Sequence, residues 1–112
     1  MIRKYHYQLG LPTNRLPSGV ISLTYSNHAL SRAVDKGITL PAFLDTSTAK
    51  VIEIEVEDGM VEKILYRVKY NAGYDMLLAI IPYRKFVKTA WLNSVTDKHT
   101  TLNASEYDRP RS

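Results

Sequence analysis

The sequence predicts an α+β domain in which an N-terminal arm and one helix precede a four-stranded antiparallel β-meander. Two observations support this fold class. A capped amphipathic pattern spans His28–Lys36, and from Lys50 onward polar and apolar residues alternate between tight turns. Successive strands that are joined by tight turns pair as antiparallel neighbours, and the helix then packs on one face of the sheet.

The first 19 residues are interrupted by two glycines and two prolines, so no long helix or strand is expected there. Residues 1–19 are therefore predicted to form an arm or irregular lead-in. Residues 20–112 are predicted to form a single α+β domain, because a chain of 112 residues buries one modest core and does not divide into two. Val20–Tyr25 has the composition of a short strand.

One helix is predicted from about His28 to Lys36. Ser26 or Asn27 can cap its N-terminus, and Gly37 can end it in a left-handed conformation. Its expected apolar stripe consists of Leu30, Ala33 and Val34. His28 and Arg32 lie four residues apart on another face of the helix.

Four strands are predicted after a connector over Pro41–Thr48. They are Val51–Glu57, Val61–Tyr70, Tyr74–Pro82 and Phe86–Asn93. The turns between them are Asp58-Gly59, Asn71–Gly73 and Pro82–Lys85, the first being a strong two-residue hairpin signal. The inward face of the last strand stays open, because both of its alternating sets mix apolar with polar residues. That choice decides whether Lys88 or Thr89 points toward a site there.

Composition limits the function classes. The chain is 45% hydrophobic, which is ordinary for a globular protein, and it has no cysteine for disulfides, thiol chemistry or zinc. No apolar run approaches the roughly 20 residues that cross a bilayer, and the N-terminus lacks the apolar core of a signal peptide. Three dispersed histidines do not make a metal site. We expect a cytoplasmic protein without membrane association, metal or cofactor.

The net charge of +4 conceals a segregation of charge along the chain. Acidic residues dominate positions 45–62, and lysine and arginine dominate positions 63–98. Clustered cations attract polyanions, so nucleic-acid binding is one interpretation. The other is that the strands expose charged residues on a solvated face.

Two segments resemble a known group of proteins. Ser26–Ile38 resembles the first helix of small toxin-like families with the pattern His-x-x-x-Arg-x-x-x-(Arg/Lys)-Gly-Ile, and Val87–Tyr107 resembles C-terminal segments of toxin-like and phage proteins. These families belong to the barnase, EndoU, colicin and RelE-like group of metal-independent ribonucleases. The resemblance covers residues 20–107. It implies a helix followed by a four-stranded antiparallel sheet, and RNA as the substrate.

Metal-free RNA cleavage uses the substrate's 2′-hydroxyl as the nucleophile, and it needs an acid, a base and cations around the phosphate. His28 and His99 are the candidate acid and base, Arg32 a candidate clamp, and Thr89 a candidate hydrogen-bond donor. The candidate nucleic-acid-binding residues are Arg67, Lys69, Lys85, Lys88, Lys98 and Trp91, with Tyr66 as another base-stacking candidate.

Plain structural roles compete with each of these assignments. His28 can serve the helix N-terminus, and His99 can be a solvated turn residue. Arg67 and Lys69 can pair across a hairpin with glutamates of the preceding strand. Trp91 can anchor the core, because an aromatic side chain on a strand usually buries its area.

Three functions remain for the chain. The first is a toxin-like, RNA-directed endoribonuclease of a phage or mobile element, with RNA as substrate and an antitoxin or immunity protein as partner. The alternative is a non-catalytic module that binds nucleic acid or an acidic protein through a basic sheet face. The third is an assembly protein whose arm, residues 1–19, reaches a neighbouring subunit.

Overall fold

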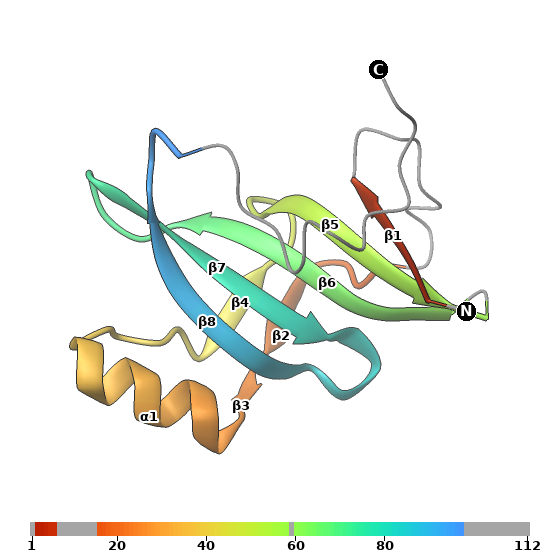
Figure 1. The fold of residues 1–112 in the computed structure, drawn as a ribbon, viewed down its shortest axis with the longest axis horizontal. Coiled ribbons are helices and arrows are strands. Elements are labelled where there is room, and N and C mark those ends of the chain that lie inside the picture. The colour runs from red at the N-terminus through yellow and green to blue at the C-terminus, as the bar shows by residue number, and fades with distance from the viewer. Residues whose placement is uncertain (1, 7–15, 59, 98–112) are drawn as a thin grey trace.

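A computed structural model describes residues 2–6, 16–58 and 60–97 of the protein and shows an α+β fold with one helix (Figure 1). The elements follow in the order β1 (Ile2–His6), β2 (Val20–Ser22), β3 (Thr24–Tyr25), α1 (Asn27–Lys36), β4 (Phe43–Asp45), β5 (Lys50–Glu57), β6 (Met60–Lys69), β7 (Tyr74–Ile81), the 3-10 turn η3 (Pro82–Arg84) and β8 (Phe86–Ser94). The predicted fold class is confirmed at this level.

The main sheet contains more strands than the predicted meander. Its order is β1-β5-β6-β7-β8-β3, antiparallel throughout except that β3 runs parallel to β8. The four predicted strands form its centre as β5 to β8. The sheet gains β1 at one edge, from a segment that the sequence assigns to an arm, because Ile2–His6 pairs in register with β5.

A second, two-stranded sheet lies outside the predicted meander. It pairs β2 with β4, so the predicted strand over Val20–Tyr25 is divided between two sheets and the predicted connector contains a strand. The sequence did not predict this division because the strands are short and their pairing partners lie far apart in the chain. Three-residue strands carry too little alternation to be recognised, and the pairing of Ile21 with Leu44 spans the whole helix.

The main core lies between the two sheets. Its buried side chains come from β2, β4 and strands β6 to β8, namely Ile21, Leu44, Ile64, Tyr66, Met76, Leu78, Ile80, Val87 and Ala90. A smaller cluster on the opposite face of the main sheet consists of Leu65, Leu77 and Ala79. In Figure 1, α1 lies below the main sheet, on the side of β2 and β4. The described part of the chain therefore places its helix and small sheet on one face.

A β-bulge decides which face each residue of β8 occupies. Thr89 pairs with Ala79, yet Val87 pairs with Ile80, so Lys88 is the extra residue of the strand. The bulge shifts the alternation by one position. As a result, Val87 and Ala90 both enter the main core, and Trp91 packs on the opposite cluster. Neither of the two alternating sets of residues in the last strand therefore faces the main core over the whole strand.

The predicted limits of α1 are confirmed. Ser26 caps the helix, and its Oγ accepts a hydrogen bond from the Ala29 N–H at 3.0 Å. Gly37 ends it at a φ of 66°, and the following Ile38 N–H donates to the Ala33 carbonyl at 2.8 Å. Left-handed backbone of this kind favours glycine, which explains the sharp stop.

The predicted apolar stripe of α1 is wrong in part. Ala29 and Ala33 are 1% and 6% exposed, whereas Leu30 and Val34 are 47% and 81% exposed. The helix packs beside β8 through its smallest side chains, which brings its backbone close to the strand. Its larger apolar residues turn toward solvent.

This orientation predicts different stabilities for two truncations. Leu78→Ala should lower the free energy of unfolding by about 2–5 kcal/mol, because it leaves a cavity in the main core. Val34→Ala should change it by about 0.5 kcal/mol or less, because the Val34 side chain is solvated. Urea denaturation of both variants measures these values. A loss for Val34→Ala close to that of Leu78→Ala would contradict the orientation of α1.

Candidate functional site

A cavity of about 340 Å³ lies where α1 meets β8, and we call it the α1–β8 cleft. Its lining residues are Arg32, Lys36, Ile38, Tyr74, Trp91 and Leu92. Two cationic, two aromatic and two aliphatic residues therefore line one space. Its volume lies within the roughly 300–1,000 Å³ that is common for ligand pockets.

The helix brings the two cations to the cleft. Arg32 and Lys36 are spaced four residues apart, so they project from the same face of α1 as His28, one turn earlier. All three side chains are exposed. Because α1 approaches β8 through Ala29 and Ala33, the adjacent cationic face borders the strand.

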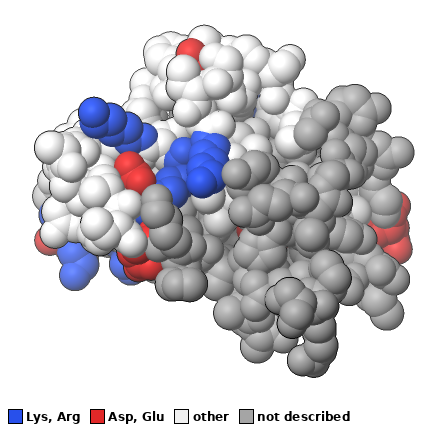
Figure 2. All heavy atoms as spheres, turned by 90° about the horizontal axis from the view of Figure 1, so that it is seen from above, with Lys and Arg blue, Asp and Glu red and all other residues white. Residues whose placement is uncertain are grey.

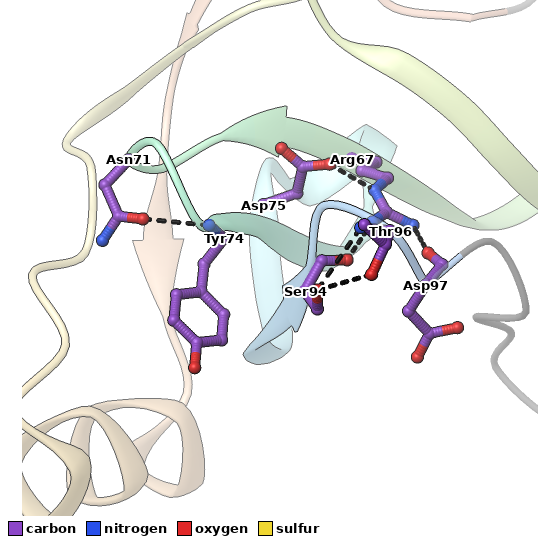
Figure 3. Close-up of polar contacts among 7 residues, drawn as sticks. All are labelled: Arg67, Asn71, Tyr74, Asp75, Ser94, Thr96 and Asp97. Carbon is purple, nitrogen blue, oxygen red and sulfur yellow. Dashed lines mark hydrogen bonds and ion pairs between the residues drawn. The ribbon is translucent and has the colours of Figure 1, made fainter.

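The sheet brings the two aromatic rings. Trp91 of β8 pairs with Leu77 of β7, and its side chain is half-buried against the smaller apolar cluster. Tyr74 begins β7 directly after a turn that Asn71 organises, since the Asn71 Oδ1 accepts hydrogen bonds from the N–H groups of Gly73 and Tyr74, both at 2.9 Å. The Tyr74 ring points toward α1 (Figure 3) and is 48% exposed.

The docking of α1 also places Lys88 near the start of the helix. Ser26 Oγ donates a hydrogen bond to the Lys88 carbonyl at 2.7 Å, and the Ser26 N–H donates to the Val87 carbonyl at 3.0 Å. The Lys88 side chain is exposed, and Thr89 beside it is half-buried on the face that carries Trp91.

The remaining predicted site residues are not gathered at the cleft. Lys85 is exposed at the turn before β8, with a left-handed φ of 52°, and Lys69 lies at the far end of β6 beside a different cavity. Lys98 and His99 lie outside the described residues, so the expected approach of His28 to His99 stays a prediction. Among the sequence-predicted residues, the structure thus brings Arg32 and Trp91 together in one cavity.

Arg67 has a structural position, which corrects the expectation that it binds phosphate. It is 8% exposed, and each of its three guanidinium nitrogens donates a hydrogen bond within the chain (Figure 3). Nε donates to Asp75 Oδ2 at 2.7 Å, Nη1 to the Asp97 carbonyl at 2.6 Å and Nη2 to the Ser94 carbonyl at 2.9 Å. Arg67 therefore joins β6 and β7 to the chain that leaves β8.

Tyr66 is likewise unavailable for base stacking. Its side chain is 1% exposed in the main core, and burial raises the pKa of its hydroxyl to about 12. The phenol stays neutral at ordinary pH and serves as a core residue.

The surface charge is mixed where it can be seen. In the view of Figure 2, blue Lys and Arg atoms lie next to red Asp and Glu atoms on the described part of that face. Charges also pair across strands, since Lys63 Nζ lies 3.6 Å from Glu55 Oε1. Arg67, one of the two cations expected to pair with the β5 glutamates, forms an ion pair with Asp75 of β7.

Metal ligation and membrane spanning concern the described residues, 2–6, 16–58 and 60–97. Within these ranges no group of three or more His, Cys, Asp or Glu side chains could hold a metal ion. No helix in the same ranges has both the length and the apolar character to span a bilayer. Among the described residues, no nucleophile paired with a general base lines the α1–β8 cleft. Its cationic and aromatic residues can bind an anion that carries a planar group.

No protein-family model, curated protein or solved structure matches the chain.

Two of the four cationic and aromatic residues of the cleft, Lys36 and Tyr74, were not predicted from the sequence. Lys36 had a usable signal, because it continues the four-residue spacing of His28 and Arg32 along α1. Tyr74 had none, because its place opposite the helix depends on how the β6–β7 hairpin lies over the chain after Gly37.

The Arg67 contacts predict a loss of stability when the guanidinium is removed. Arg67→Ala should lower the free energy of unfolding by on the order of 3 kcal/mol, because it leaves the Asp75 carboxylate without its partner and two carbonyls without donors. Lys69→Ala, two residues along the same strand and exposed, should change it by about 0.5 kcal/mol or less. Equal effects in chemical denaturation would contradict a structural role for Arg67.

Proposed function

We propose that the protein binds single-stranded RNA, and that one nucleotide occupies the α1–β8 cleft. The observation that carries the proposal is the meeting of two exposed cations, Arg32 and Lys36, with the aromatic residues Tyr74 and Trp91 around one cavity. An unpaired nucleotide offers both complementary groups, an anionic phosphate and a base with two π-faces.

The roles divide between the helix and the sheet. Arg32 and Lys36 would contact phosphate oxygens, and Tyr74 and Trp91 would stack on the base. Ile38 and Leu92 form an apolar wall against which a base loses water at little cost. A duplex hides its base faces in its own stack, so single strands should bind more tightly than the same sequence in a duplex.

Removing the cationic charges should weaken RNA binding and its dependence on salt. Arg32→Gln with Lys36→Gln should reduce the slope of log K against log salt by about 1.4, because each lost phosphate contact on a single strand removes about 0.7. Fluorescence anisotropy of a labelled single-stranded oligoribonucleotide at several salt concentrations measures the slope.

Lys85→Gln is the matched control for this experiment. It removes one positive charge from an exposed residue that does not line the cleft, so slope and affinity should stay close to wild type. A slope that falls equally for Lys85→Gln and for either single cleft variant would mean that a diffuse surface binds RNA, and it would contradict the proposal.

RNA cleavage is a second candidate function, and the position of His28 favours it. His28 precedes Arg32 by one turn on the cationic face of α1, where an imidazole could exchange a proton near a bound phosphate. In this reaction the 2′-hydroxyl loses its proton to a base as its oxygen bonds to phosphorus, the bond to the 5′-oxygen breaks, the 5′-oxygen takes up a proton, and a cyclic phosphate forms.

The cleavage hypothesis predicts a separation of binding from catalysis. Purified wild-type protein should convert single-stranded RNA into products that end in a cyclic phosphate, and His28→Ala should abolish these products while it retains binding. Product analysis over about pH 5–8 gives the answer. Intact RNA across that range, with binding preserved, would leave the chain as a binding module.

A further inference from the structure

A second and larger cavity lies next to the α1–β8 cleft. It has a volume of about 630 Å³, and we call it the β4–β6 cavity. Its walls combine apolar core residues with side chains that can contact a ligand, chiefly Phe43, Asp45, Lys69 and Tyr70. Phe43 is 63% exposed although it belongs to a strand.

Ile38 and Thr39, which we call the ridge, lie where the two cavities adjoin. Ile38 lines the cleft, and Thr39, the next residue, lines the β4–β6 cavity. The two cavities also adjoin at the main sheet, because Leu92, which lines the cleft, is the cross-strand partner of Met76, which lines the β4–β6 cavity. The Thr39 N–H donates to the Tyr70 hydroxyl at 3.1 Å, which ties the ridge to the β6–β7 hairpin.

On the side of Asp45, the β4–β6 cavity suits a nucleotide base better than a phosphate. Asp45 Oδ1 accepts hydrogen bonds from the Ser47 Oγ at 2.6 Å and the Ser47 N–H at 3.0 Å. These bonds hold the pKa of the Asp45 carboxyl below its ordinary value, so it stays ionised and accepts hydrogen bonds only. Asp45 Oδ2 accepts no hydrogen bond from the described residues, and a fixed negative charge repels phosphate.

We infer that the β4–β6 cavity is a second nucleotide subsite, where Asp45 selects a base with an exocyclic amino group over uracil. The inference rests on the proposed RNA binding in the α1–β8 cleft. A strand that crosses the ridge places its next base between Phe43 and Asp45, with Lys69 available for a phosphate. An amino group donates to the carboxylate, whereas the carbonyl that uracil carries at the same ring position faces it with a lone pair.

Cytosine and uracil provide the sharpest test, because they have the same ring size and differ at this position. Wild-type protein should bind an oligocytidine about tenfold more tightly than an oligouridine of equal length, within the range of one good base contact. Asp45→Asn should remove most of that ratio, because an amide can donate to the uracil carbonyl. Asparagine keeps an oxygen for the Ser47 hydrogen bonds, so the turn should still form.

Asp35→Asn is the control, since it makes the same charge change at an exposed residue of α1 that lines neither cavity. It should leave the cytidine-to-uridine ratio unchanged. Phe43→Ala adds a second readout that does not involve charge: it should weaken binding of the oligocytidine.

The outcomes separate the two proposals. Equal affinity for both oligonucleotides would overturn the second subsite, and so would an unchanged ratio in Asp45→Asn. RNA binding that is weakened by substitution of Tyr74 would still uphold the first proposal, that RNA binds in the α1–β8 cleft. Failure of both oligonucleotides to bind would overturn RNA binding itself, and the subsite with it.

Discussion

The hydroxyl of Ser26 is the contact on which the candidate site depends most. It accepts the hydrogen bond that starts α1, and it donates one to the Lys88 carbonyl, while the Ser26 N–H bonds to Val87. One residue therefore begins the helix and fixes its first turn to β8. Two alanines then allow the helix to lie close along the strand. This attachment helps to set where Arg32 and Lys36 lie relative to Trp91.

The same strand shows how a local irregularity in the sheet has consequences for the site. The bulge at Lys88 lets Val87 and Ala90 share the main core, and it presents Trp91 on the opposite face. At the other end of β8, Arg67 holds the carbonyls of Ser94 and Asp97 (Figure 3). The strand that forms one wall of the cleft is thus fixed at both ends by polar contacts to neighbouring elements.

Local signals in the sequence predicted the elements that local chemistry determines. Ser26 and Gly37 marked the ends of α1, and the turn residues marked the hairpins of the central strands. Pairings between distant segments left no such signal: β1 with β5, β2 with β4, and β3 with β8. The site divides in the same way. Arg32 and Trp91 were recognised as residue types, but Tyr74 enters the cleft only through the tertiary fold, and Arg67 was misassigned because its partners lie on other strands and beyond β8.

The single tryptophan of the chain allows the central claim to be measured directly. The claim is that RNA enters the cleft where α1 meets β8, so a bound base must change the surroundings of Trp91. Titration with a single-stranded oligoribonucleotide should quench the tryptophan fluorescence, and the midpoint should equal that of binding measured by anisotropy. Saturable RNA binding that leaves the fluorescence of Trp91 unchanged would place the RNA elsewhere and contradict the account.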